Sequence, residues 1–196
     1  RIRYSVIFAT EIYKEAYREE KRLKMLRVVK TKLPGVLLLK FKKFEDHRGE
    51  FVELYNEKIY RRNGINVKFV QEDISISSQG VLRGIHGDKE TWKLVTCLLG
   101  RIYLVVVNCD KTSDMFGRWQ SFTLTQKNMH QVLVPPKYGV AHLALTDKII
   151  LHYKQSTYYN PKIQFTCKWN DKRFNIRWPI KNPILSRRDR IGDYVK

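Results

Sequence analysis

The chain lacks the features that would place it in a membrane or in the secretory pathway. It contains no run of about eighteen apolar residues, the length needed to cross a bilayer as a helix. Its first residues also lack a charged segment followed by an apolar stretch and a small-residue cleavage site. We therefore expect a cytoplasmic protein with no membrane partner.

Cysteine is scarce as well. The three cysteines, Cys97, Cys109 and Cys167, are odd in number and widely spaced, and each lies inside a strand-like run. A disulfide framework or a zinc site needs more cysteines at closer spacing, so this pattern favours buried, reduced thiols.

Acidic residues are few relative to basic ones: 19 Asp and Glu stand against 38 Lys and Arg, which gives a formal net charge of +19. Such a surface attracts polyanions, either nucleic acid or a phosphorylated small molecule. The basic residues are scattered along the chain and form no block. This scatter is typical of a lysine-rich surface, and we expect no nucleic-acid partner.

What the chain does contain is enough apolar sequence for one sizeable core, because 43% of its 196 residues are hydrophobic. Residues 10–26 carry Ile12, Ala16 and Leu23 at helical spacing among charges, after a candidate cap at Thr10. This spacing predicts an amphipathic helix.

After residue 35 the sequence consists mainly of short apolar or alternating runs, which are separated by glycine, proline, asparagine and aspartate. These runs are 36–44, 50–55, 67–77, 93–100, 101–108, 120–125, 131–135, 141–146 and 148–154. Their even spacing predicts an antiparallel sandwich or barrel, whose open end is a natural cavity for a small ligand. The last thirty residues are rich in loop signals and should cover one face.

Eight motifs in a fixed order carry a resemblance to a known family. They are FEDHRGEF at 44–51, FVQEDISISSQGVLRGIH at 69–86, KLVTCLLGRIYLVVVN at 93–108, FGRW at 116–119, VPPKYGVAH at 134–142, YKQSTYYNP at 153–161, WND at 169–171 and LSRRD at 185–189. From Met25 to about Arg190 the chain resembles the dTDP-4-dehydrorhamnose 3,5-epimerase family. The resemblance implies an all-β, cupin-type antiparallel jelly-roll barrel over 25–196, usually dimeric, with short C-terminal helical or loop segments. It leaves 1–24 as an N-terminal extension.

One loop departs from the rhamnose-pathway pattern. The segment HGDKETWKLVTC at 86–97 has no aromatic residue after the histidine, and its loop before Lys93 is shorter. It resembles a branch of the family that acts on GDP-linked 4-keto-heptoses. Both dTDP and GDP therefore remain open as the nucleotide, as do hexose and heptose as the sugar.

The chemistry that the resemblance implies is inversion of a carbon beside a ketone, which needs a base on one face and an acid on the other. Carried over by motif, His86 is the base, Asp189 its orienting partner, Tyr153 the acid, and Lys93 the group that stabilises the enolate oxygen. We expect His86 and Lys93 to lie on two adjacent strands that aim both side chains at one cavity. No metal and no cofactor is expected.

The substrate is expected to be a nucleotide-diphospho-sugar. Arginine recognises phosphate through a planar fork of donors, and the matching positions for the diphosphate are Arg48 and Arg83. Phe51, Glu53 and Gln71 match substrate-channel positions, and Tyr159 matches a stacking partner for the base. Asp73 stands where the family usually has asparagine, which can alter sugar recognition. Without the resemblance, Arg48 and Glu53 would be interpreted as surface ion-pair residues and Phe51 as core packing.

Three functions remain in competition. The first is an epimerase that inverts C3, C5 or both in a nucleotide-linked 4-keto sugar. The second is a metal-dependent cupin oxygenase, in which His142 and His86 join Asp88 or Glu90 around iron. The third is a non-catalytic, basic jelly-roll binding module, since the fold alone does not imply a function.

Overall fold

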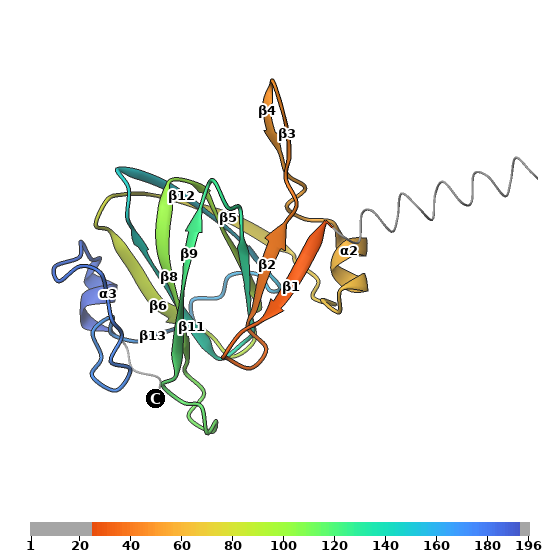
Figure 1. Ribbon diagram of the computed structural model, residues 1–196. Helices are drawn as coiled ribbons and strands as arrows, with labels where there is room; N and C mark the ends of the chain where they lie inside the picture. Colours follow the sequence, from red (N-terminus) through yellow and green to blue (C-terminus); the bar gives the residue numbers. More distant parts are fainter. Residues whose placement is uncertain (1–24, 193–196) are drawn as a thin grey trace, which may run out of the picture. The chain divides into compact units, whose positions relative to one another are not determined.

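The protein is known from a computed structural model that describes residues 25–192 (Figure 1). The predicted extension 1–24 lies outside the described residues. So does the helix predicted over 10–26, except for its last two positions. Of these, Leu26 begins the first strand. Among the described residues, no helix is both long and apolar enough to traverse a bilayer.

Two antiparallel sheets make up most of the described chain. The first sheet has the order β1 (Leu26–Lys30), β2 (Leu37–Phe41), β10 (Gln131–Val134), β7 (Lys93–Leu99), β12 (Lys148–Gln155) and β5 (Gln71–Ser78). The second has the order β13 (Phe165–Thr166), β6 (Leu82–Gly87), β11 (Tyr138–Ala144), β8 (Arg101–Asn108) and β9 (Trp119–Thr125). Apart from the pairs β1–β2 and β8–β9, neighbours in these sheets come from distant parts of the chain, as in a jelly roll. The predicted all-β, cupin-type jelly roll is confirmed.

The core lies between the two sheets. Leu104 and Val106 of β8, which lies between β11 and β9, join the inter-sheet cluster, together with residues such as Val132 and Ile149 of the other sheet. Because side chains alternate along a strand, Val105 of the same β8 points the other way, into a second cluster. A strand that is buried on both faces has to be apolar throughout, which explains the unbroken run of valines in β8.

The second cluster covers the outer face of the five-stranded sheet. Ile85 and Val105 pack there with Phe174 from the C-terminal segment, and Trp178 packs against them. The three cysteines are buried and free, as predicted. The fold also brings two of them close, because the sulfur atoms of Cys109 and Cys167 lie 3.9 Å apart.

The chain divides into two compact units. Residues 29–39 and 67–192 form the larger described unit, and residues 25–28 and 40–66 form the smaller. The smaller unit holds the hairpin of β3 (Phe44–Asp46) and β4 (Gly49–Phe51) and the helix α2 (Glu57–Arg62). The strand predicted over 50–55 is therefore too long, since β4 ends at Phe51. Helix α2 was not predicted, because its six residues are too few to show a helical period.

Candidate active site

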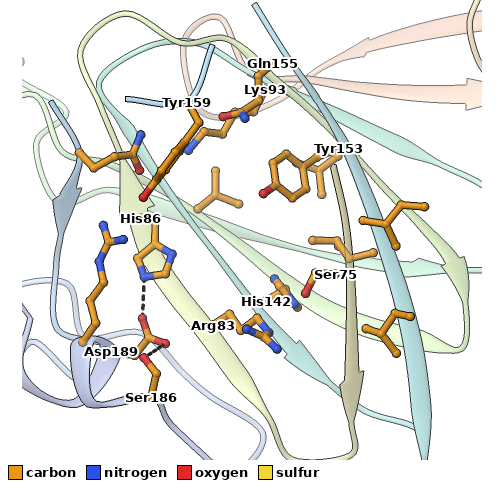
Figure 2. A pocket seen from close by; sticks show the side chains of 17 residues that line it. Ser75, Arg83, His86, Lys93, His142, Tyr153, Gln155, Tyr159, Ser186 and Asp189 are labelled. Carbon is orange, nitrogen blue, oxygen red and sulfur yellow. Dashed lines mark hydrogen bonds and ion pairs between the residues drawn. The ribbon is translucent and has the colours of Figure 1, made fainter. Parts of the chain in front are cut away.

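A cavity of about 520 Å³ opens in the larger unit, a volume typical of sites for small molecules (Figure 2). Both sheets and the C-terminal segment contribute side chains to it. The lining consists of Ile74, Ser75, Ile76, Arg83, His86, Lys93, Val95, Val140, His142, Leu151, Tyr153, Gln155, Tyr159, Gln164, Ser186, Arg188 and Asp189.

One wall of the cavity follows from the two-residue period of β12. Leu151, Tyr153 and Gln155 lie two residues apart, so they point to the same face of the sheet. The pairing of β12 with β7 sets Gln155 opposite Lys93, and Tyr153 stands beside Val95 in the same ladder. The amide of Gln155, the ammonium of Lys93 and the phenol of Tyr153 are therefore held on this wall by regular strand geometry.

The opposite wall depends on a β-bulge in β6. Along β11, His142 and Val140 are two residues apart, but their partners on β6, Arg83 and His86, are three apart. The extra residue turns both side chains toward the cavity, although a regular strand would put them on opposite faces. A bulge of this kind re-aims side chains at a ligand site, and here it aims an arginine and a histidine.

Gly84 makes this bulge sterically allowed. Its φ is +119°, and a Cβ at that position would lie 2.5 Å from the carbonyl oxygen of Val140. Such a distance is shorter than any van der Waals contact, so only glycine fits between β6 and β11. The glycine in the motif RGIH is thus required by the approach of two backbones.

His86 and Lys93 do not lie on adjacent strands, contrary to the prediction. His86 belongs to β6 in the five-stranded sheet, and Lys93 begins β7 in the six-stranded sheet. The segment 88–92 crosses from one sheet to the other and does not form a hairpin turn. The two side chains reach the same cavity because the sheets pack face to face, so they approach it from opposite walls.

A histidine–carboxylate pair lies at the N-terminal end of the C-terminal helix α3 (Arg187–Ile191). The Nε2 atom of His86 is 2.5 Å from Oδ1 of Asp189 (Figure 2). Asp189 is buried, with 2% of its surface exposed. Ser186, the N-cap of α3, donates its hydroxyl to the other carboxylate oxygen at 2.7 Å. Capping the helix and holding the carboxylate are thus done by one serine.

The protonation of this pair follows from its contacts. Burial by itself raises the pKa of Asp189, but the hydrogen bonds from His86 and Ser186 outweigh burial and leave the pKa of the carboxyl below its ordinary value. The carboxylate is therefore ionised at neutral pH, and it accepts a hydrogen bond from the N–H group at Nε2 of His86. In the neutral imidazole of His86, Nδ1 then carries the lone pair.

Two further titratable groups face the pair across the cavity. Burial lowers the pKa of the Lys93 ammonium, with a smaller opposing effect from Asp88 and a reinforcing one from Arg188. Burial also raises the pKa of the Tyr153 phenol, and the charge of Asp73 adds to that effect. Tyr153 therefore stays protonated at neutral pH and is able to donate a proton.

His142 is a third titratable group that lines the cavity, besides Lys93 and Tyr153. It is 6% exposed, and burial lowers its pKa to about 3, so the imidazole is neutral. Among the described residues, neither its Nε2 atom nor the hydroxyl of Ser75 has a hydrogen-bond partner. Figure 2 shows both side chains at the same end of the cavity, where they offer polar atoms to a ligand.

Comparison with known proteins matches this arrangement to one family. A sequence model described as dTDP-4-dehydrorhamnose 3,5-epimerase matches residues 30–196. The chain belongs to this family of isomerases. Its relatives include the dTDP-4-dehydrorhamnose 3,5-epimerase of Shigella flexneri, which is 37% identical over 171 residues, or 85% of this chain and 94% of the relative.

Solved structures of epimerases share the fold. The dTDP-4-dehydrorhamnose 3,5-epimerase of Bacillus anthracis, with TDP and PPi bound, is 35% identical and superimposes with a TM-score of 0.83, covering 87% of this chain and 99% of that one. The dTDP-6-deoxy-D-glucose-3,5-epimerase of Legionella pneumophila, in complex with dTDP-4-keto-L-rhamnose, is 30% identical with a TM-score of 0.81, covering 85% and 91%.

The iron site considered as an alternative would need the carboxylate of Asp88 or Glu90 beside His86 and His142, and neither carboxylate is placed to bind iron there. Asp88 is 2% exposed, and one of its oxygens accepts the backbone N–H groups of Glu90 and Thr91 while the other accepts the amide of Gln164. Glu90 is exposed and does not line the cavity. The described residues contain no cluster of three or more histidine, cysteine or carboxylate groups arranged to hold a metal ion.

Six predicted site residues line the cavity, and five do not. Those in the cavity are His86, Lys93, Tyr153, Asp189, Arg83 and Tyr159. Gln71 and Asp73 lie on β5, opposite Gln155 and Tyr153 in the ladder. Gln71 accepts the backbone N–H of Tyr159, and Asp73 accepts the amide of Gln155.

The remaining three predicted residues belong to the smaller unit. Arg48 is exposed and pairs with Asp46 at 2.5 Å, Phe51 is 67% exposed, and Glu53 accepts a hydrogen bond from Asn56. The alternative interpretation of Phe51 as core packing does not fit this exposure. Their role in substrate binding stays a prediction from the family resemblance.

Sequence reasoning missed several lining residues, namely Ser75, Gln155, Gln164, Ser186 and Arg188. For Gln155 a signal was present, because it follows Tyr153 by two residues in a strand and so shares its face. For Gln164, Ser186 and Arg188 the irregular C-terminal segment carries no period from which a direction could be inferred.

Proposed function

We propose that the protein inverts one or both carbons beside the ketone of a nucleotide-diphosphate-linked 4-keto sugar. The observation that carries the proposal is the cavity in which the His86–Asp189 pair on one wall faces Tyr153 and Lys93 on the other. A proton taken from one face and returned from the other changes the configuration of a carbon, and these two walls supply both faces.

The base is His86 through Nδ1, since Nε2 is held by Asp189. It removes the proton from the carbon beside the ketone, and the electron pair of the broken C–H bond moves into an enolate. Asp189 stabilises the imidazolium that forms. A buried carboxylate at 2.5 Å is suited to that role because it is already ionised.

The negative charge of the enolate gathers on the ketone oxygen. The Lys93 ammonium faces the cavity opposite the base, so it stabilises this charge more than it stabilises the neutral ketone. Tyr153 then delivers its phenolic proton to the carbon from the face opposite His86. The raised pKa of Tyr153 keeps this proton in place until the enolate has formed.

The diphosphate needs cationic donors near the same cavity. Arg83 and Arg188 both line it, and each presents a guanidinium group. We propose that they bind the diphosphate, with Arg48 as a further contact by family resemblance and Tyr159, which is 53% exposed, stacking on the base. The thymidine nucleotides named with the relatives support dTDP, and the HGD loop at 86–88 supports a GDP-linked heptose.

We also propose a homodimer, which the family resemblance implies. Ile74 and Ile76 on the edge strand β5 are 60% and 56% exposed and would supply apolar surface to such an interface. A cytoplasmic location stays a prediction from the sequence.

Solvent deuterium exchange tests the reaction. The protein is incubated in deuterated water with dTDP-4-keto-6-deoxyglucose and, in parallel, with a GDP-linked 4-keto-heptose, without added metal or nicotinamide. We expect deuterium to enter one carbon beside the ketone and then the other, because each lies one bond from the ketone carbon. His86→Asn, which keeps a polar side chain but has no base of comparable strength, should abolish the exchange while the protein stays folded.

Incorporation at a single carbon would restrict the enzyme to one inversion. Absence of incorporation with both substrates, or exchange at nearly the wild-type rate in His86→Asn, would overturn the proposed function.

A further inference from the structure

Gln155 lines the cavity but has no part in the reaction proposed above. It follows Tyr153 on the inner face of β12 and is 4% exposed. In the ladder it lies directly opposite Lys93, and Figure 2 shows the two side chains at the same end of the cavity. Directly opposed residues have Cβ atoms about 5 Å apart, so a group bound by Lys93 is within reach of Gln155.

The amide of Gln155 is held in one orientation by Asp73. Nε2 of Gln155 donates to Oδ2 of Asp73 at 2.9 Å, and Nε2 of Gln71 donates to the same oxygen at 2.8 Å. An ionised carboxylate only accepts hydrogen bonds, so the NH₂ end of each amide must point to it. The carbonyl end of Gln155 is then turned away from Asp73.

The two glutamines differ in what their carbonyl oxygens do. Oε1 of Gln71 accepts the backbone N–H of Tyr159 at 2.8 Å, so that amide is used at both ends. Among the described residues, Oε1 of Gln155 takes part in no hydrogen bond. It is therefore a preoriented acceptor on the wall that also carries the Lys93 ammonium.

We propose that Gln155 is a specificity-determining residue, whose carbonyl oxygen accepts a hydrogen bond from the C3 hydroxyl of the bound sugar. The inference rests on the proposed function, because Lys93 places the ketone oxygen of C4 at this end of the cavity. C3 is one bond away and carries a hydroxyl donor. C5 of a 4-keto-6-deoxyhexose carries only the ring oxygen and a methyl group, neither of which donates.

Asp73 is the positioning residue for this contact. With asparagine at that position, an amide would face the amide of Gln155, and the latter could present either end to the cavity. The carboxylate removes this freedom, so that only an acceptor is offered to the sugar. A buried acceptor left without its donor is costly, which is how such a site rejects a substrate that lacks the hydroxyl.

The test compares the 4-keto-6-deoxy sugar nucleotide with its 3-deoxy analogue, using deuterium incorporation at C5, a position that both compounds share. We expect the wild-type protein to exchange the hydroxyl-bearing compound about 10-fold to 100-fold faster in kcat/KM. In Gln155→Met, which keeps the length but not the acceptor, this ratio should fall toward one. Asp73→Asn should give an intermediate ratio. Because the readout is a ratio, loss of folded protein cancels.

The matched control is Gln71→Met, which removes the other amide from the same carboxylate oxygen without removing a cavity-lining group. It should keep the wild-type ratio. A wild-type ratio near one, or a Gln155→Met variant that slows both compounds equally, would overturn the inference while leaving the epimerase reaction intact. Absence of exchange at both C3 and C5 in the wild type, with the dTDP-linked and the GDP-linked sugar alike, would overturn the proposed function, and the inference with it.

Discussion

Tyr153 and His86 approach the cavity from different sheets, so their chemical contributions are separable by substitution. Tyr153→Phe keeps the aromatic ring but removes the proton that is delivered from the far face. His86 can still remove a proton and return a deuteron to the same face. We expect deuterium to enter the substrate while inverted product falls by about 100-fold or more.

Mass spectrometry of the recovered sugar nucleotide, together with NMR assignment of its configuration, measures the two quantities separately. If exchange and inversion are lost to the same extent, Tyr153 is not the acid of the second step.

Lys93 sets the expected loss of activity at high pH. Burial lowers the pKa of its ammonium, so the enolate loses its cationic partner at a lower pH than an exposed lysine would allow. The pKa of Tyr153 is shifted upward, so the phenol loses its proton later. The alkaline limb of the kcat profile should therefore fall below the ordinary lysine pKa.

The charge of Arg188 contributes to lowering the pKa of Lys93, so Arg188→Gln should move this limb to higher pH. The position of the limb is measured with saturating substrate, since Arg188 is also a proposed diphosphate contact. A limb that stays in place, or moves to lower pH, would show that Lys93 does not control it.

At the scale of a single element, the bulge in β6 depends on Gly84. In Gly84→Ala the new Cβ meets the carbonyl oxygen of Val140 at 2.5 Å and the backbone has a φ of +119°, so strain and overlap add. We expect the free energy of unfolding to fall by more than about 2 kcal/mol. Denaturant unfolding of purified protein measures this loss.

Gly64 provides the matched control for Gly84. Its φ is +80°, but no atom lies within 4 Å of a Cβ built there. Gly64→Ala should therefore cost only the backbone strain, about 1 kcal/mol. Similar losses in the two variants would mean that the close approach of β6 and β11 contributes nothing beyond φ.

At the scale of the whole molecule, the segment before Met25 should be dispensable for catalysis. Every residue with a proposed catalytic role lies in the larger unit, between residues 67 and 192. A protein that begins at Met25 should keep its kcat/KM and its oligomeric state, as measured by exchange rates and by light scattering coupled to gel filtration. A soluble but inactive or monomeric product would assign the segment a role in the site or in the dimer.

The fold class was predictable without coordinates, because alternating apolar runs and turn residues are local signals that specify strands wherever they occur. The sequence also named His86, Lys93, Tyr153 and Asp189, because their motifs resemble those of the family, and their catalytic roles stay predictions. That His86 and Lys93 belong to opposite sheets was not predictable in this way, because the residues between them are compatible both with a hairpin turn and with a crossover between sheets.

The bulge that aims Arg83 and His86 at one cavity likewise depends on how β6 pairs with β11, and no local pattern encodes that pairing. The same holds for the pairing that sets Gln155 between Lys93 and the carboxylate of Asp73. Contacts between residues some sixty to eighty positions apart arise from packing, and packing is a property of the whole folded chain.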